Sequence, residues 1–318
     1  MVKHGVHRTL WNERVWRSVR PLRARGLAVL TYHRVGCQRP FSPGIPVDVF
    51  RKQIRWISRN CKVVSPEDVP TTCFADRGPR RPSVLVTFDD GYRDYYTTAY
   101  PILREFSVRA VNFLATRFLD GSSHFWWDRV DAAVALSRVR GVRLPWNGRH
   151  IPMAGDGARE VARLSKAELK RSAVPDRSPM LQELLSRLGF PDGPPIERQV
   201  MTWDEVRLTA LQTTFGGHTH RHAFLPKLDG PMMAAEVREC RDLIASQLGV
   251  RPRLFAYPNG GWNESSGAVL IELGFEAAFT TQPAFNSLGV DPLLLGRFHA
   301  PMSAEKLAWM LSGWSKIL

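Results

Sequence analysis

The sequence predicts an α/β protein whose fold is a distorted, seven-stranded (β/α) barrel. The chain has 318 residues, a length that suits one α/β barrel domain. Near-continuous apolar runs such as VLVTF at 84–88 are typical of strands buried on both faces. These runs alternate with segments of helical periodicity, which is the pattern of parallel β/α units.

The first predicted elements lie between residues 27 and 115. LAVLTYH at 27–33 predicts a buried strand. Residues 46–60 predict a helix, because a proline opens the segment and apolar residues follow at helical spacing. The strand at 84–88 is followed by a predicted helix at 95–106 and a strand at 108–115.

The same alternation resumes near residue 202. The predicted order is a helix near 202–212, a strand at 213–217, a long helix near 229–247, a strand at 253–257, a helix near 264–273, strands at 275–280 and near 293–298, and a final helix at 303–314.

Residues 117–200 interrupt this order. They contain a helical pattern in FWWDRVDAAVAL, a hairpin signal around Asn147-Gly148, two charged helical stretches and the loop PDGPP. We interpret this region as an insertion in one barrel domain that spans residues 27–318, preceded by a basic helical segment at residues 1–26.

The chain is strongly basic, with a net charge of +14 and a pI near 10.2. Such an excess favours anionic partners, among them nucleic acid, an anionic membrane surface or an acidic glycan. Basic residues are densest in residues 1–26, which we expect either to pack on the barrel as a solvated helix or to lie on an anionic membrane. No DNA- or RNA-binding motif is present, so we do not expect a nucleic-acid partner.

The sequence also carries information on location. No apolar run near the start resembles a secretory signal, and no window approaches the ~20 apolar residues of a spanning helix. Four scattered cysteines form no CxxC pair, which indicates free thiols in a reducing compartment. We therefore expect a cytoplasmic protein, either free or peripheral at the inner face of the membrane.

Two groups of metal-ligand residues each follow a predicted strand. Asp89 and Asp90 follow VLVTF, and adjacent carboxylates are costly to crowd unless a cation or a proton shares the site. His218 and His222 follow TTFGG, and their i, i+4 spacing predicts two imidazoles on one face of a helical turn, with His220 pointing elsewhere. That spacing suits two ligands of one transition metal.

Each pair alone has a simpler explanation. An Asp-Asp pair at a strand end is often a helix cap, and a lone HxxxH is often a surface or core pair. Together, however, both pairs would meet at the carboxyl end of one barrel, where barrel enzymes place their chemistry. Two histidines and one aspartate leave open coordination positions, as in a catalytic metal site, and the second carboxylate would act as general base.

Three motifs carry a resemblance to a known family. TFDDGYRD at 87–94, HTHRH at 218–222 and FAYPNGGWN at 255–263 resemble the motifs of the NodB-homology polysaccharide deacetylases, carbohydrate esterase family 4. Weaker likeness in YHRV at 32–35, FWWDRV at 125–130 and MTWDEV at 201–206 extends the resemblance over roughly residues 27–300.

The resemblance implies a NodB-type barrel and a role for each matching residue. Asp89 would be the general base, and a divalent ion, most often zinc in this family, would be bound by Asp90, His218 and His222. The segment Tyr257, Pro258 and Asn259 would wall the substrate site, with backbone near Asn259 holding the oxyanion.

The sequence departs from the family pattern at several places. Ala256 stands where the third motif usually carries an arginine that orients the catalytic aspartate. Arg297 is the alternative for orienting a carboxylate, and we also expect it among the substrate-binding residues. The fourth motif, with its Asp and Trp, is not clear. His299 is the candidate general acid, although it would also fit as a loop residue.

Aromatic residues and one further histidine complete the expected substrate site. His33 ends the first strand and should face the barrel mouth. Of the adjacent Trp126 and Trp127, one is expected to stack on a sugar face and the other to join the core; we assign the stacking role to Trp126. Trp262 is a second stacking candidate.

The predicted function is metal-dependent removal of an N-acetyl group from an amino sugar in a glycan or a precursor of a cell-envelope glycan. A deacetylase of a small non-sugar amide, such as an acetylated polyamine, is one alternative. A catalytically inactive glycan-binding barrel is the other.

Overall fold

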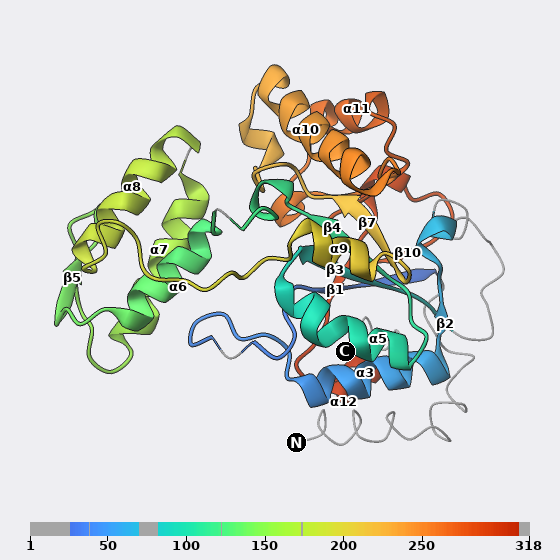
Figure 1. Ribbon diagram of the computed structural model, residues 1–318, viewed down its shortest axis with the longest axis horizontal. Helices are drawn as coiled ribbons and strands as arrows, with labels where there is room; N and C mark the ends of the chain where they lie inside the picture. The colour runs from blue at the N-terminus through green and yellow to red at the C-terminus, as the bar shows by residue number, and fades with distance from the viewer. Residues whose placement is uncertain (1–25, 38, 70–81, 122, 173, 312–318) are drawn as a thin grey trace.

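The computed structural model describes residues 26–37, 39–69, 82–121, 123–172 and 174–311. Figure 1 shows a barrel of strands surrounded by helices, with a separate helical lobe at its side. Nearly all of the predicted basic segment 1–26 lies outside the described residues. Among the helices within them, none has the length and apolar character needed to cross a membrane.

Parallel strands form the centre of the barrel. In spatial order they are β1 (Leu27–Tyr32), β3 (Ser83–Asp90), β4 (Ala110–Leu114), β7 (Thr213–Gly217), β8 (Leu254–Ala256) and β9 (Ala277–Phe279). A seventh, irregular position is filled by the segment 295–299. Leu295 pairs with Phe279 of β9, and β11 (Phe298–His299) pairs in parallel with β1. The predicted distorted barrel of seven strands is therefore confirmed.

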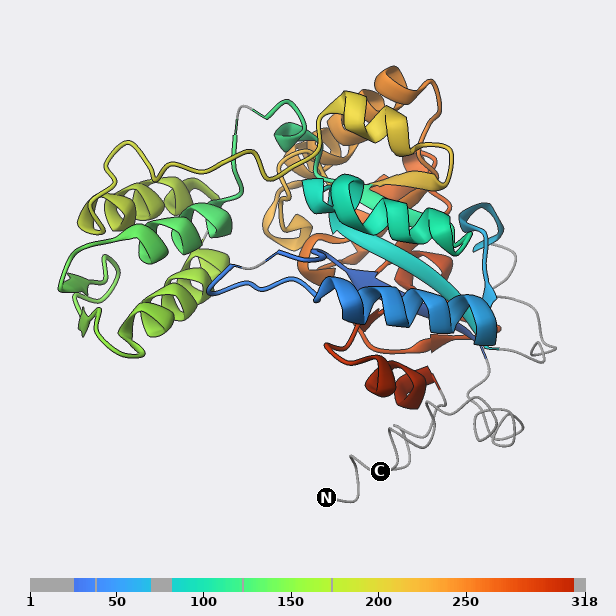
Figure 2. The same cartoon turned by 60° about the horizontal axis from the view of Figure 1, so that its bottom comes forward.

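Helices surround the outside of the barrel. The described helices around it are α3 (Val47–Asn60), α5 (Tyr100–Glu105), α9 (Trp203–Thr209), α10 (Gly230–Leu248), α11 (Glu264–Glu272) and α12 (Ala304–Leu311). In Figure 1 α3 and α12 lie below the strands and α10 and α11 above them, and Figure 2 shows the same molecule turned by 60°. Local signals fix their ends: Thr202 and Glu205 form a capping box at α9, and Asp229 caps α10.

The strand residues alternate between two cores, as a pleated strand requires. The inner core fills the barrel and is made of Leu27, Val29, Val64, Val69, Leu85, Val111, Phe113, Leu254, Ala256, Ala277, Phe279 and Leu295. The intervening residues of β1 and β3, such as Ala28, Leu30, Val84 and Val86, pack outward against the helices. This parity decides which side chains reach the barrel mouth.

The predicted insertion forms a lobe with a hydrophobic core of its own. Its elements are α6 (Trp126–Leu136), β5 (Gly141–Arg143), β6 (His150–Pro152), α7 (Gly157–Arg171) and α8 (Val174–Arg187). The expected hairpin is present, because β5 and β6 pair antiparallel around Asn147 and Gly148. Gly148 has φ +67°, and the Asn147 side chain accepts from the backbone N–H of Arg149.

One predicted detail is wrong and some short elements were not predicted. The expected strand near 293–298 is a 3-10 turn, η7 (Pro292–Leu294), because the Asp291 side chain caps a proline-led turn. Only β11 remains of that strand. The two-residue strands β2 (Lys62–Val63) and β10 (Phe285–Asn286) carry too few residues for periodicity to reveal them.

The cysteines within the described residues are free thiols, as expected. Cys37, Cys61 and Cys240 have no disulfide partner there, and Cys73 lies outside the described residues.

Candidate active site

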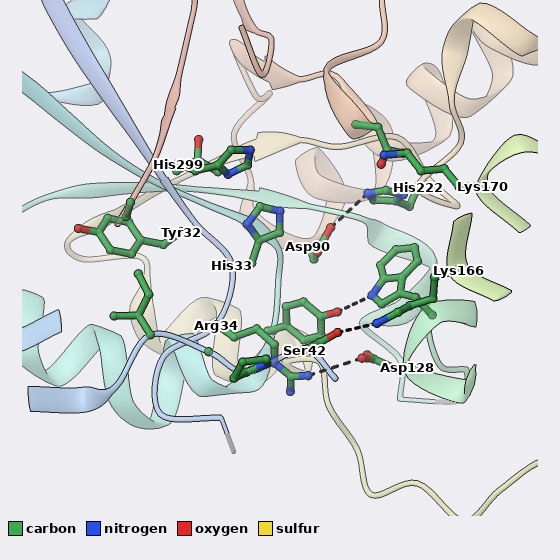
Figure 3. A pocket seen from close by; sticks show the side chains of 18 of the residues that line it. Tyr32, His33, Arg34, Ser42, Asp90, Asp128, Lys166, Lys170, His222 and His299 are labelled. Atoms are coloured by element: carbon green, nitrogen blue, oxygen red, sulfur yellow. Dashed lines mark hydrogen bonds and ion pairs between the residues drawn. The ribbon is translucent and has the colours of Figure 1, made fainter. Parts of the chain in front are cut away.

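The paired aspartates point in different directions, as predicted. Asp89 continues the inward parity of β3 and is 3% exposed. Asp90 would face outward by the same parity, but it has φ +74°, in the left-handed region. Gly91 follows with φ +75°. This turn in the backbone brings the Asp90 carboxylate to the histidines instead of the helices (Figure 3).

The two histidines converge on Asp90, although the expected helical turn is wrong. Residues 218–222 form a loop in which Thr219 and His222 have φ of +60° and +53°. The Nε2 atom of His218 lies 3.5 Å from Asp90 Oδ1, and that of His222 lies 3.4 Å from the same oxygen. Residues with left-handed backbone torsions in the loop, and not helical spacing, bring both imidazoles to the same oxygen of Asp90.

These three side chains fit a divalent metal ion. One ligand atom from each lies within 4.8 Å of the others. Asp90 Oδ1 is buried and has no hydrogen-bond partner, a costly arrangement that a bound cation would relieve. The Nδ1 of His218 lies 2.7 Å from the carbonyl oxygen of Ala256, which fixes the ring and leaves Nε2 as the ligand atom.

The electrostatics of the site agree with that chemistry. Burial, reinforced by Asp89 and Asp128, raises the pKa of Asp90 well above its usual range. Burial also lowers the pKa of His218 and holds the pKa of His222 well below its usual value. Both imidazoles are therefore neutral, the form that binds metal, and a cation would offset the crowding of the two carboxylates.

Asp89 has a different partner. Arg297 donates two hydrogen bonds to it, from Nη1 to Oδ1 at 2.7 Å and from Nη2 to Oδ2 at 2.8 Å. Burial acts to raise the pKa of Asp89, but the Arg297 guanidinium and then His218 bring it well below its usual range. Asp89 is thus an ionised carboxylate in a buried position.

Arg297 is 1% exposed and lies inside the barrel, where its guanidinium carbon is 5.6 Å from the centre of the Phe113 ring. It does not line the cavity. Its predicted contact with substrate is therefore not supported, whereas the alternative, orientation of a carboxylate, matches the observed contact with Asp89.

A cavity of about 610 Å³ opens between the barrel mouth and the helical lobe. The barrel contributes His33, Asp90, His222, Asn259 and His299 to its lining. Figure 3 shows His33 and His299 across the cavity from the lysines of the lobe. The metal-ligand cluster therefore lies at a place that a substrate can reach.

The two remaining predicted histidines lie side by side in this cavity. The Nε2 of His33 is 3.9 Å from Asp89 Oδ2, and the ring centres of His33 and His299 are 6.1 Å apart. His299 is exposed to the cavity. Both rings are thus within reach of a group bound between Asp89 and the lobe.

The model of the family described as "Polysaccharide deacetylase" matches residues 76–140 and 188–278. The chain belongs to the polysaccharide deacetylase (NodB/CE4) family. The match includes Asp89, Asp90, His218 and His222, and it omits residues 141–187, which lie in the helical lobe.

An individual member of the polysaccharide deacetylase family matches a shorter part of the chain than the family model does. YxkH of Bacillus subtilis (strain 168), a polysaccharide deacetylase by name, is 29% identical over 99 residues, which are 31% of this chain. The match spans about a third (35%) of YxkH's length.

Solved structures show the same fold over most of the chain. The Streptococcus pyogenes deacetylase PplD, solved in complex with acetate, is 18% identical with a TM-score of 0.62, covering 90% of this chain and 98% of its own. IcaB from Ammonifex degensii is 19% identical with a TM-score of 0.59, covering 91% and 98%.

The third family motif lies differently from the expected arrangement. Along β8 the side chain of Ala256 faces the inner core, so that of Tyr257 faces outward and packs in the cluster that contains Phe255. Pro258 is buried, and neither it nor Tyr257 lines the cavity. Asn259 alone of the three predicted residues does so, with φ +56°.

The adjacent tryptophans have separate roles. Trp127 packs against His222, with ring centres 4.7 Å apart, and donates its indole N–H to Tyr92 Oη at 2.7 Å. It therefore supports a metal ligand. Trp126 also lines the cavity and lies under the guanidinium of Arg177. Trp262 is 43% exposed and lies outside the cavity lining.

A buried ionic network at the cavity was missed by the sequence analysis. Asp128 of α6 is 1% exposed and accepts from Arg39 at 2.9 Å, with Arg34 Nη1 at 3.5 Å. Asp131 pairs with Lys166 of α7 at 2.7 Å. YHRV and FWWDRV contain Arg34, Asp128 and the start of this network, but nothing in their spacing pairs them. The network attaches the loop after β1 to the lobe.

Proposed function

We propose that this member of the polysaccharide deacetylase family is a metal-dependent de-N-acetylase. It would hydrolyse the N-acetyl group of an amino sugar, a linear amide, in a glycan or glycan precursor. One observation carries the proposal: a metal-ligand set of Asp90, His218 and His222, of which Asp90 and His222 line the cavity, lies beside the separately ionised Asp89. The family supports deacetylation as the reaction type.

The residues divide into distinct roles. Asp90 Oδ1 and the Nε2 atoms of His218 and His222 would hold the cation, which we propose to be zinc. A bound divalent cation supplies Lewis-acid activation of water and of the amide carbonyl. Asp89, kept ionised by Arg297, accepts a proton from the attacking water.

The leaving amine needs a proton, and His299 is the proposed donor because it is exposed in the cavity. His33, next to Asp89, is positioned to contact the same end of the substrate. Backbone near Asn259 would stabilise the oxyanion, and Trp126 would stack on a sugar ring.

The cavity lining favours a glycan over a small cationic amide. An acetylated polyamine would require a closed, acidic site, whereas Arg34, Lys166 and Lys170 line this cavity. A glycan-binding barrel without activity would not need the complete Asp90, His218 and His222 set. A cytoplasmic location, with the basic segment 1–26 at the inner face of the membrane, belongs to the same proposal and is supported by the net charge of +14.

Mass spectrometry of N-acetylated substrates tests this function. The full chain, loaded with zinc, is incubated with N-acetylglucosamine oligosaccharides and, separately, with N-acetylated polyamines. Loss of an acetyl group from the oligosaccharides, absent in the chelator-treated protein, is the expected result. Loss from the polyamines alone, or from neither substrate, contradicts the proposal.

A further inference from the structure

The lobe contributes two helices, α6 and α7, to the wall of the cavity. Helix α7 contributes Lys166, Ala167 and Lys170 to the lining. Figure 3 shows the two lysine side chains on the lobe side of the cavity. A substrate bound at Asp90 and His222 would share the cavity with the ammonium groups of α7.

The two lysines differ in their partners. Lys166 contacts Asp131 Oδ1 at 2.7 Å and donates to Ser42 Oγ at 3.0 Å, so its charge is already compensated. Lys170 is exposed, and the described residues provide no carboxylate within ion-pairing distance of its ammonium group. Lys170 is thus the cation that remains available to a ligand.

The helix that carries Lys170 is held in place on both sides. The Lys227 ammonium, from η5 (Leu225–Lys227) of the barrel, donates to the carbonyl oxygen of Arg171 at the end of α7. On the other side, Ser42 and Lys166 join the loop after β1 to the lobe. Lys170 is therefore presented from a fixed position, which limits the entropy lost on binding.

The charges that line the cavity also favour an anionic ligand. Its charged lining consists of three cationic side chains, Arg34, Lys166 and Lys170, and two carboxylates, Asp90 and Asp128. Arg34 lies beside Asp128 and Lys166 beside Asp131, so the remaining charges of the lining are Lys170 and Asp90. A divalent cation on Asp90 would make that remaining charge positive. A cavity of this sign attracts anions and repels cations.

We infer that Lys170 forms an anion subsite, and that the natural substrate carries a phosphate or carboxylate group next to the acetamido sugar. This inference rests on the proposed deacetylase function and adds the substrate class. A lysine ammonium is a compact point charge well suited to phosphate. The same subsite would accept a uronate carboxylate, and the test distinguishes the two sources.

The test compares three substrates of equal length: a neutral N-acetylglucosamine oligosaccharide, one that carries a phosphate on the neighbouring position, and one with a neighbouring uronate. They are assayed with the zinc-loaded full chain, with Lys170→Gln and with Arg163→Gln. Arg163 is the matched control, because it is exposed on the same helix and does not line the cavity.

The original protein should favour one anionic substrate over the neutral one by about tenfold in kcat/KM, as one well-placed ion pair allows. Lys170→Gln should bring this ratio toward one, while Arg163→Gln should leave it unchanged. The preference should also shrink as ionic strength rises, because the pair is solvent-accessible.

The outcomes separate the inference from the function beneath it. Equal turnover of all three substrates, or an anion preference that persists in Lys170→Gln, would contradict the anion subsite at Lys170. Either result would still support the deacetylase function. No turnover of any substrate by the original protein contradicts the deacetylase itself. If Lys170 served only the dipole of α7, its loss would lower the melting temperature and leave the substrate ratio unchanged.

Discussion

Asp89 and Arg297 form a two-point ion pair inside the barrel, although 208 positions separate them in the sequence. Asp89 ends β3, and Arg297 lies in the irregular segment that closes the barrel between β9 and β1. By the resemblance to the third family motif, Ala256 would stand at the position that usually carries an arginine. The barrel-closing segment supplies one from another direction.

Arg297→Met should destabilise the protein by about 3–5 kcal/mol, because it leaves a buried carboxylate without its counter-ion. The pKa of Asp89 would rise, so the acid limb of the kcat/KM profile should move to higher pH. In the original protein the folded pKa of Asp89 lies below the unfolded value, so the pair stabilises the fold above that value and the contribution is lost as pH falls.

Thermal unfolding across pH and the pH dependence of kcat/KM measure these effects. Arg297→Lys is the matched variant, since it keeps the charge but loses the two-point contact, and it should give intermediate values. An acid limb that stays in place in Arg297→Met would show that Arg297 does not control the ionisation of the base.

Asp89→Asn should lower kcat by about 10²- to 10⁴-fold, because an amide cannot accept the proton of the attacking water. The zinc content should stay near that of the original protein, since Asp90, His218 and His222 are untouched. Deacetylation assays and elemental analysis of the same sample give both quantities. Undiminished turnover would refute the assignment of Asp89 as base.

His222→Ala should lower metal content and remove the stabilisation that zinc provides. For the original protein, zinc at about 100 times its dissociation constant should add about 2.7 kcal/mol to the free energy of unfolding. Melting temperatures with zinc and with chelator measure this difference. His33→Ala, which changes a cavity histidine outside the ligand set, should keep the full zinc response; equal responses in both variants would argue against the ligand assignment.

Glu236 of α10 holds the loop that carries both candidate metal-ligand histidines. Its buried carboxylate accepts from the backbone N–H of Arg221 at 2.8 Å, and its carbonyl oxygen accepts from the N–H of His220 at 3.0 Å. The loop contains the left-handed Thr219 and His222, a conformation that persists only when its surroundings enforce it.

Glu236→Leu should therefore weaken zinc binding by about tenfold, because losing the acceptor leaves the part-buried N–H of Arg221 unpaired at a cost of about 1–3 kcal/mol. Arg221→Ala keeps that N–H and loses only the guanidinium contacts with Glu236 and Glu239, so it should bind zinc nearly as well as the original. Glu236→Gln should recover much of the affinity. Zinc titration and hydrogen exchange of residues 218–223 check this, and a lower melting temperature with unchanged zinc affinity would restrict Glu236 to a stabilising role.

The candidate metal ligands could be predicted because ligand-type residues follow strands whose ends must meet in a parallel barrel. Their local geometry could not: the spacing of His218 and His222 suggested a helical turn, whereas two left-handed residues produce the convergence. Spacing reports which residues are near one another, and backbone torsions decide where they point.

Two other features could not be predicted, for different reasons. Because β8 is buried on both faces, its sequence does not reveal which side chains face the barrel interior. Tyr257 was expected to wall the substrate site, but it packs in the cluster that contains Phe255. Arg297 was correctly selected as a possible orienting residue, but its pairing with Asp89 depends on how the barrel closes. That closure involves a bridge at Leu295 and a two-residue strand, which are too short to be predicted from hydrophobic periodicity.

The late position of Arg297 has a consequence for biosynthesis. As the ribosome extends the nascent chain, Asp89 emerges 208 residues ahead of its counter-ion. Until Arg297 has been synthesised, a buried Asp89 carboxylate would lack its guanidinium counter-ion. We therefore expect the barrel mouth to reach its final structure only after the closing segment 295–299 has been made. Premature termination after residue 222 and before residue 297 would yield polypeptides that retain Asp90, His218 and His222 but lack Arg297, the guanidinium that pairs with Asp89.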